Sequence, residues 1–112
     1  MITVVELPEF LRRAKKLLHE DERDELVNYL ASHPTAGVIL EGTGGIRKLR
    51  WKRKGMGKRG GVRIMYYYHT EQYPVFLLTL FGKSEQANVS KAERNALAKL
   101  IDELLESYRK TS

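Results

Sequence analysis

The chain has 112 residues, no cysteine and a net charge of +6. The length predicts one domain spanning residues 1–112, and the missing cysteines exclude disulfides and thiolate metal sites. There is no apolar run of the ~18 residues that a membrane span needs, and the N-terminus is too short and too acidic for a signal peptide. A cytoplasmic protein without a membrane partner is therefore expected.

The first third of the chain predicts one strand and two helices. The segment "ITVVEL" (residues 2–7) is short and β-branched, as strands are. Pro8 suits the first turn of a helix, and apolar residues then recur at helical spacing as far as Leu18. A second helix is expected over residues 19–34, with acidic residues crowding its first turn and His33-Pro34 ending it. The two helices should form an antiparallel hairpin.

The rest of the chain predicts three strands and a last helix. A glycine-rich connection over residues 35–45 leads into alternating patterns at residues 46–54 and 62–69, and residues 75–81 are apolar on both faces. These three segments should form an antiparallel meander. Ser90 and Glu93 have capping-box spacing, and an apolar helical stripe follows as far as Tyr108. The order β, α, α, β, β, β, α predicts an α+β fold.

Positive charge is concentrated in one segment of the chain. Residues 47–63 hold nine Lys or Arg, and no Asp or Glu occurs between Glu41 and Glu71, so the remaining residues sum to −3. Such a patch raises the local concentration of polyanions. Nucleic acid is the commonest partner of this kind, with anionic lipid or an acidic protein as alternatives.

Alternation in the basic strand places four cations on one face: Lys48, Arg50, Lys52 and Lys54. Side chains two residues apart lie ~6.6 Å from each other, so the row can follow a phosphate backbone. The alternative is a solvated edge strand protected by lysines, which leaves the cations of the glycine-rich loop unexplained. We therefore expect RNA contacts from four residues: Lys52, Lys54, Lys58 and Arg59.

The same segment offers a route to chemistry. A lysine among positive charges favours its neutral form and can accept a proton, while arginine stabilises anionic oxygen. Together they could activate a ribose 2′-hydroxyl and hold the phosphate that it attacks. The three histidines lack metal-ligand spacing. This predicts RNA cleavage that uses neither a metal nor any other cofactor.

Aromatic residues accompany the basic strand. The alternation predicts that Tyr66 and Tyr68 face the core, as does Trp51, and that Tyr67 is exposed beside Arg63. An exposed ring among cations suits base stacking on single-stranded nucleic acid.

Three stretches, "EGTGGIRKLRW", "GMGKRGGVRIMYY" and "LLTLFGKSE", resemble the HigB branch of the RelE/ParE toxin superfamily. The resemblance covers residues 42–85 and implies a toxin of a type II toxin–antitoxin pair. It implies an N-terminal strand and helical hairpin packed on a twisted antiparallel sheet, with a C-terminal helix. RelE-like members enter the ribosomal acceptor site and cut messenger RNA there. The implied partners are the ribosome, mRNA and a HigA-like, DNA-binding antitoxin.

Matching motif positions carry catalytic roles over to this chain. Lys48 and Arg50 match the basic pair that supplies the general base and a phosphate contact, and Arg63 matches an arginine that stabilises the transition state. Lys83 matches a lysine after the last strand. Many members have an arginine where this chain has Ser84, and a stacking tyrosine in the region that aligns with residues 89–90. The resemblance therefore leaves the general acid unassigned, with Lys83 and Tyr67 as candidates.

Two other functions stay open on the sequence. A ParE-like toxin inhibits DNA gyrase without cutting RNA, and a plain RNA-binding module would need the basic patch alone. The matching lysine and arginines favour the nuclease, whereas the missing arginine and tyrosine leave the gyrase inhibitor possible.

Overall fold

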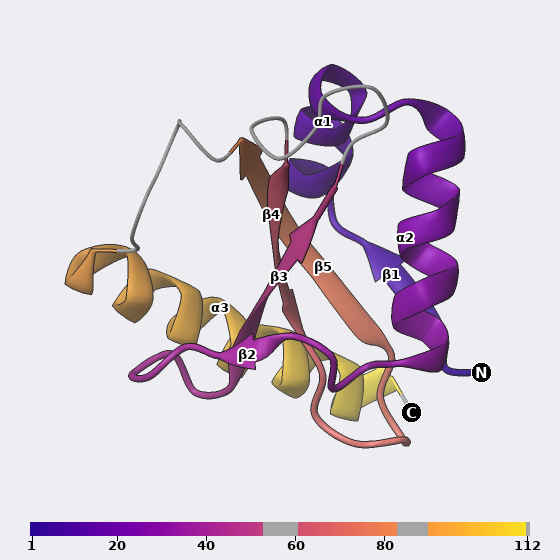
Figure 1. Ribbon diagram of the computed structural model, residues 1–112. Coiled ribbons are helices and arrows are strands. Elements are labelled where there is room, and N and C mark those ends of the chain that lie inside the picture. Colours follow the sequence, from indigo (N-terminus) through magenta and orange to yellow (C-terminus); the bar gives the residue numbers. More distant parts are fainter. Residues whose placement is uncertain (53–60, 83–89, 112) are drawn as a thin grey trace.

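The computed structural model describes residues 1–52, 61–82 and 90–111. A five-stranded sheet lies between an N-terminal helical hairpin and a C-terminal helix (Figure 1). The elements are β1 (Val4–Glu6), α1 (Pro8–Leu17), α2 (Glu20–Ser32), β2 (Val38–Ile39), β3 (Ile46–Trp51), β4 (Val62–Tyr67), β5 (Val75–Gly82) and α3 (Lys91–Thr111). The predicted α+β fold is confirmed.

The sheet has the strand order β1-β5-β4-β3-β2. Strands β3, β4 and β5 form the predicted antiparallel meander. The N-terminal strand β1 pairs with β5 in parallel, which makes the sheet mixed. The short strand β2, which pairs Val38 with Lys48 and Ile39 with Arg47, lies in a segment that the sequence predicted as a connection only.

Alternation along the central strands fills two cores, one on each face of the sheet. On β4, Val62, Ile64 and Tyr66 pack with α1 and α2 in the first core. Met65 and Tyr67 belong to the second core, which α3 completes with its apolar stripe. Because side chains alternate across a strand, α3 and the helical hairpin lie on opposite sides of the sheet (Figure 1).

A β-bulge in β5 changes this alternation at one point. Met65 pairs with Thr79 while the next residue, Tyr66, pairs with Leu77, so Leu78 is the extra residue. A bulge turns two consecutive side chains toward the same face. Leu78 and Thr79 consequently both lie on the α3 side of the sheet.

The glycine-rich turn before β3 is held by one threonine side chain. Thr43 is fully buried; its Oγ1 donates a hydrogen bond to the Leu40 carbonyl and accepts one from the Ile46 N–H, at 2.6 and 3.0 Å. The glycines around it adopt positive φ, which favours glycine: Gly42, Gly44 and Gly45. This turn fixes where β3 begins and hence which of its residues face α3.

Side chains cap two of the helices. The Ser90–Glu93 capping box is confirmed, because the Glu93 N–H donates to Ser90 Oγ and the Ser90 N–H donates to a Glu93 carboxylate oxygen. At the start of α2, the His19 N–H donates to a carboxylate oxygen of Glu22 at 2.9 Å. Among the described helices, none is long and apolar enough to cross a membrane.

Tyr66 ties the segment after α2 to the sheet. Its phenol is fully buried, donates a hydrogen bond to the Pro34 carbonyl at 2.9 Å and accepts one from the Gly37 N–H at 2.8 Å. Burial raises the pKa of this phenol. A Cβ added to Gly37 would approach the Tyr66 ring to 2.8 Å, so the close fit depends on glycine.

We expect Tyr66→Phe to lower the free energy of unfolding by about 1–3 kcal/mol, because it leaves a buried N–H and a partly buried carbonyl without their partner. Urea denaturation would measure the change. Tyr68→Phe, at a partly exposed neighbouring ring, serves as the control and should cost less than about 0.5 kcal/mol. Equal stability of Tyr66→Phe and the parent would contradict this role of the hydroxyl.

Candidate functional site

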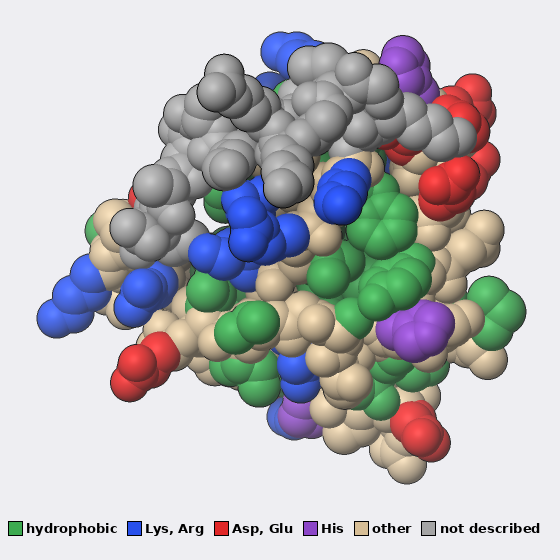
Figure 2. All heavy atoms as spheres, viewed as in Figure 1, with side chains coloured by type: hydrophobic (Ala, Val, Ile, Leu, Met, Phe, Trp, Pro, Cys, Tyr) green, Lys and Arg blue, Asp and Glu red, His purple; other side chains and the backbone are tan. Residues whose placement is uncertain are grey.

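The α3 side of the sheet is built from three cross-strand rows. The strand pairing aligns Ile46 with Tyr67, then Lys48 with Met65 and Thr79, then Arg50 with Arg63 and Phe81. The first row lies in the core that α3 covers. The other two rows are called the basic face below. Figure 2 shows Lys and Arg side chains gathered over β3 and β4.

Two arginines face each other across the basic face. Arg50 is exposed and Arg63 is half-buried, and they are direct partners in the pairing of β3 with β4. Burial, and to a smaller degree the charge of Arg50, lower the pKa of Arg63, which nevertheless stays protonated. Like charges directly opposite each other destabilise a sheet. An anion bound between the two guanidinium groups would remove this repulsion.

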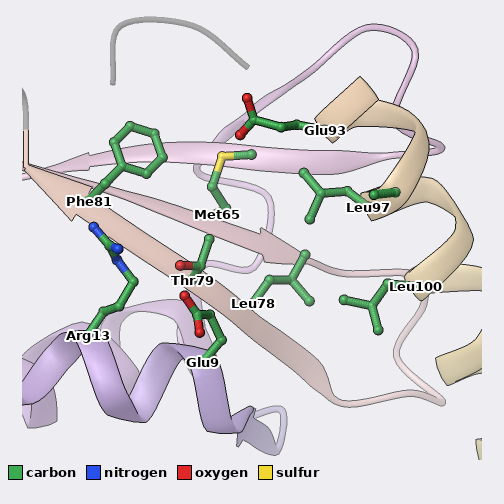
Figure 3. Close-up of a pocket in the computed structure, with 10 residues that line it drawn as sticks. Glu9, Arg13, Met65, Leu78, Thr79, Phe81, Glu93, Leu97 and Leu100 are labelled. Carbon is green, nitrogen blue, oxygen red and sulfur yellow. The ribbon is translucent and has the colours of Figure 1, made fainter. Parts of the chain in front are cut away.

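A groove of about 350 Å³ adjoins the basic face. Met65, Leu78 and Phe81 line it from the sheet, and Leu97 and Leu100 from α3 (Figure 3).

Charged side chains line the groove as well. Arg13 and Glu9 lie on its α1 side, and Glu93 lies at the start of α3 (Figure 3). Arg13 donates a hydrogen bond from Nε to the Leu80 carbonyl. It therefore binds the edge of β5 past residues 75–77, where the pairing with β1 ends. Glu9 therefore lies on the side of the groove away from the arginine pair, whereas Glu93 lies beside Met65 (Figure 3).

The predicted catalytic residues Lys48, Arg50 and Arg63 all lie on the basic face. The predicted RNA contact Lys52 is exposed but follows the last residue of β3, so the strand is shorter than the expected 46–54. The remaining predicted site residues lie outside the described part of the chain: Lys54, Lys58, Arg59 and Lys83.

The predicted exposure of Tyr67 is wrong. Its side chain is only 4% exposed, because α3 packs over the row that it shares with Ile46. Its hydroxyl lies 3.1 Å from His69 Nδ1. Burial and, secondarily, the Asp102 carboxylate raise the pKa of Tyr67. A phenol held under a helix is poorly placed to meet RNA on the basic face.

One cation of the basic segment has a structural task that the sequence did not indicate. Arg47 points to the opposite side of the sheet, and its guanidinium donates to the carbonyls of Thr35 and Gly37 at 3.2 and 2.8 Å. It reinforces the same segment that Tyr66 holds. The sequence did hold one signal for this role: alternation along β3 places the Arg47 side chain on the face opposite that of Lys48.

The fold and the basic face together define a class: small α+β proteins with a cationic, partly open sheet face suited to polyanions. A family model described as "RelE toxin of RelE / RelB toxin-antitoxin system" matches residues 8–111. The chain therefore belongs to the RelE toxin family, whose members pair with a RelB-type antitoxin.

A solved structure supports the fold. The chain is similar to the free-state structure of an Escherichia coli RelE toxin carrying two arginine-to-alanine substitutions, with 19% identity and a TM-score of 0.55. The match covers 87% of this chain and 93% of that one. At this identity the likeness establishes the architecture only.

We expect Arg63→Met to raise the free energy of unfolding by about 0.5 kcal/mol, because it removes a like-charge cross-strand pair. Arg50→Met should act in the same direction, and the double variant should gain less than the sum, since one repulsion is shared. Added salt should shrink the gain. Urea denaturation of the two single variants and the double variant, at low and at high salt, measures these changes in the free energy of unfolding.

The control for the arginine pair is Arg12→Met, which removes an exposed ion pair with Glu9 instead of a repulsion. It should leave stability unchanged or slightly lower. Fully additive effects of the Arg50 and Arg63 substitutions would show that the two guanidinium groups do not interact.

Proposed function

We propose that this toxin is a ribosome-dependent messenger RNA endonuclease. The observation that supports this best is the strand register, which brings Lys48, Arg50 and Arg63 to one face of the sheet. Strands β3, β4 and β5 contain no acidic residue, so a bound phosphate would meet cations and apolar side chains from the sheet.

In the proposed reaction, the ribose 2′-oxygen attacks the adjacent phosphorus while Lys48 takes the 2′-hydroxyl proton. A bond forms between O2′ and phosphorus, and the bond from phosphorus to the 5′-oxygen breaks. Arg63 and Arg50 hold the non-bridging oxygens, whose negative charge grows during the attack. The products carry a 2′,3′-cyclic phosphate and a 5′-hydroxyl.

The departing 5′-oxygen needs a proton. Tyr67 was one of two candidates, and its burial beneath α3 argues against it. We therefore assign the general acid to Lys83, the remaining candidate.

The antitoxin partner is proposed from charge. The +9 segment repels itself, and an acidic segment of a partner would relieve that repulsion. The stretches "EGTGGIRKLRW" and "GMGKRGGVRIMYY" further support placement in the HigB branch, with a HigA-like antitoxin.

We expect Arg63→Ala to lower the single-turnover rate of mRNA cleavage on programmed ribosomes by ~10²-fold or more, the size typical of losing one donor to a developing oxyanion. Ribosome affinity should fall much less, because the other cations of the segment stay in place. Arg12→Ala, an exposed arginine on α1, is the control and should cut at the parental rate. Parental cleavage by Arg63→Ala would refute the catalytic assignment.

We also expect ribosome affinity to fall steeply with salt, because each phosphate neutralised contributes ~0.7–0.9 to the log–log slope. Replacing Lys52, Lys54, Lys58 and Arg59 together by Gln should flatten the slope by about 3. Titrations between low and physiological salt measure it. An unchanged slope would mean that these four residues do not meet phosphates.

A further inference from the structure

An aromatic cluster lies where β3 meets α2, on the side of the sheet opposite the basic face. The rings of Tyr29 and His33 are stacked with centroids 4.7 Å apart, and the Tyr29 ring lies 5.4 Å from that of Trp51. We call these three residues the aromatic platform. The Trp51 ring also packs against the core beneath α2, which gives the platform a fixed base.

The platform is open to solvent. Tyr29 is 37% exposed and His33 is exposed, whereas Trp51 is partly buried. An open stack of rings offers flat π surfaces, and every nucleobase can stack on such a surface.

Cations flank the platform along the strand. Trp51 stands between Arg50 and Lys52, both exposed. On the α2 side the surroundings are acidic: Glu20 to Glu22 lie in the first turn, and Glu25 lies one helical turn before Tyr29. The positive charge lies on the β3 side of the rings, and aromatic rings next to cations are the combination that single-stranded nucleic acid requires.

The edge of β3 connects the platform to the basic face. Strand β2 pairs only with Arg47 and Lys48, so no described strand covers the edge of β3 from Leu49 to Trp51. Arg50 faces the basic side and Trp51 the platform side at adjacent positions, because successive side chains of a strand point to opposite faces. A polynucleotide crossing this edge can place phosphates on one side and bases on the other.

We propose that Tyr29, His33 and Trp51 form a stacking site for unpaired nucleobases of RNA. The proposal rests on the proposed nuclease function. It adds to that function a second site, which binds nucleotides other than the one that is cleaved. Stacking contributes affinity that does not depend on counterion release, whereas the lysines and arginines contribute affinity that does.

The test uses the full chain and a single-stranded heptanucleotide RNA with 2′-O-methyl groups, which cannot be cleaved. Trp51 is the only tryptophan of the chain, so quenching of its fluorescence reports directly on the platform. The parent should be quenched on binding. Tyr29→Ala should bind about 5- to 100-fold more weakly, the range for losing one stacked base, with the same salt slope as the parent. Tyr29→Phe should keep parental affinity.

Two control variants separate stacking from other effects. Tyr108→Ala removes an equally exposed ring (37%) on α3 and should bind like the parent. Lys52→Gln should lower the salt slope by ~0.7 and leave the quenching intact. If Tyr29→Ala melts at a lower temperature than the parent, its weaker binding could reflect lost stability. The binding measurement is then repeated with His33→Ala, which removes the last ring of the stack.

The proposal is overturned if the parent shows no quenching, if Tyr29→Ala and His33→Ala bind within twofold of the parent, or if Tyr108→Ala is equally impaired. It is also overturned if Tyr29→Ala weakens only the antitoxin complex. Binding of the parent to ribosomes with and without mRNA then shows whether the stacked base belongs to the messenger RNA or to ribosomal RNA. Intact RNA binding without ribosomal cleavage would refute the nuclease and leave the platform standing.

Discussion

The register between β3 and β4 is the constraint on which the functional surface depends. It places Arg50 directly opposite Arg63, an arrangement that costs stability in the free protein. A shift by one residue would turn the arginines of the two strands to opposite faces. The turn around Thr43 and the hydrogen bonds of Arg47 and Tyr66 hold this register from the β2 side. Residues outside the basic face thus help to maintain the charge pair.

The sequence predicted most of what depends on local pattern. Alternation in β3 was enough to place Lys48 and Arg50 on one face, because side-chain direction has a period of two. The Ser90–Glu93 cap followed from spacing alone. The same patterns could not show that β1 pairs with β5 in parallel, because strand partners distant in the chain leave no local signal.

Tyr67 shows where the pattern was insufficient. Its face was predicted correctly, but exposure depends on which part of that face α3 covers, and this is decided by helix packing. The bulge at Leu78 is another such feature, since it changes side-chain direction in a continuous apolar run. The aromatic platform was missed because its rings come from two elements, with Tyr29 and His33 one helical turn apart and Trp51 far along the chain.

The parallel pairing of β1 with β5 also bears on how the protein is made. Residues 4–6 find their partners at residues 75–77, so β1 must wait until β5 has been synthesised and has emerged. Contacts between such distant segments form late and slow folding. Arg63 likewise lies in a strand whose neighbour β5 is still to come. A nascent toxin therefore lacks its completed sheet, and with it the β5 side of the basic face, until β5 has left the ribosome that synthesises it.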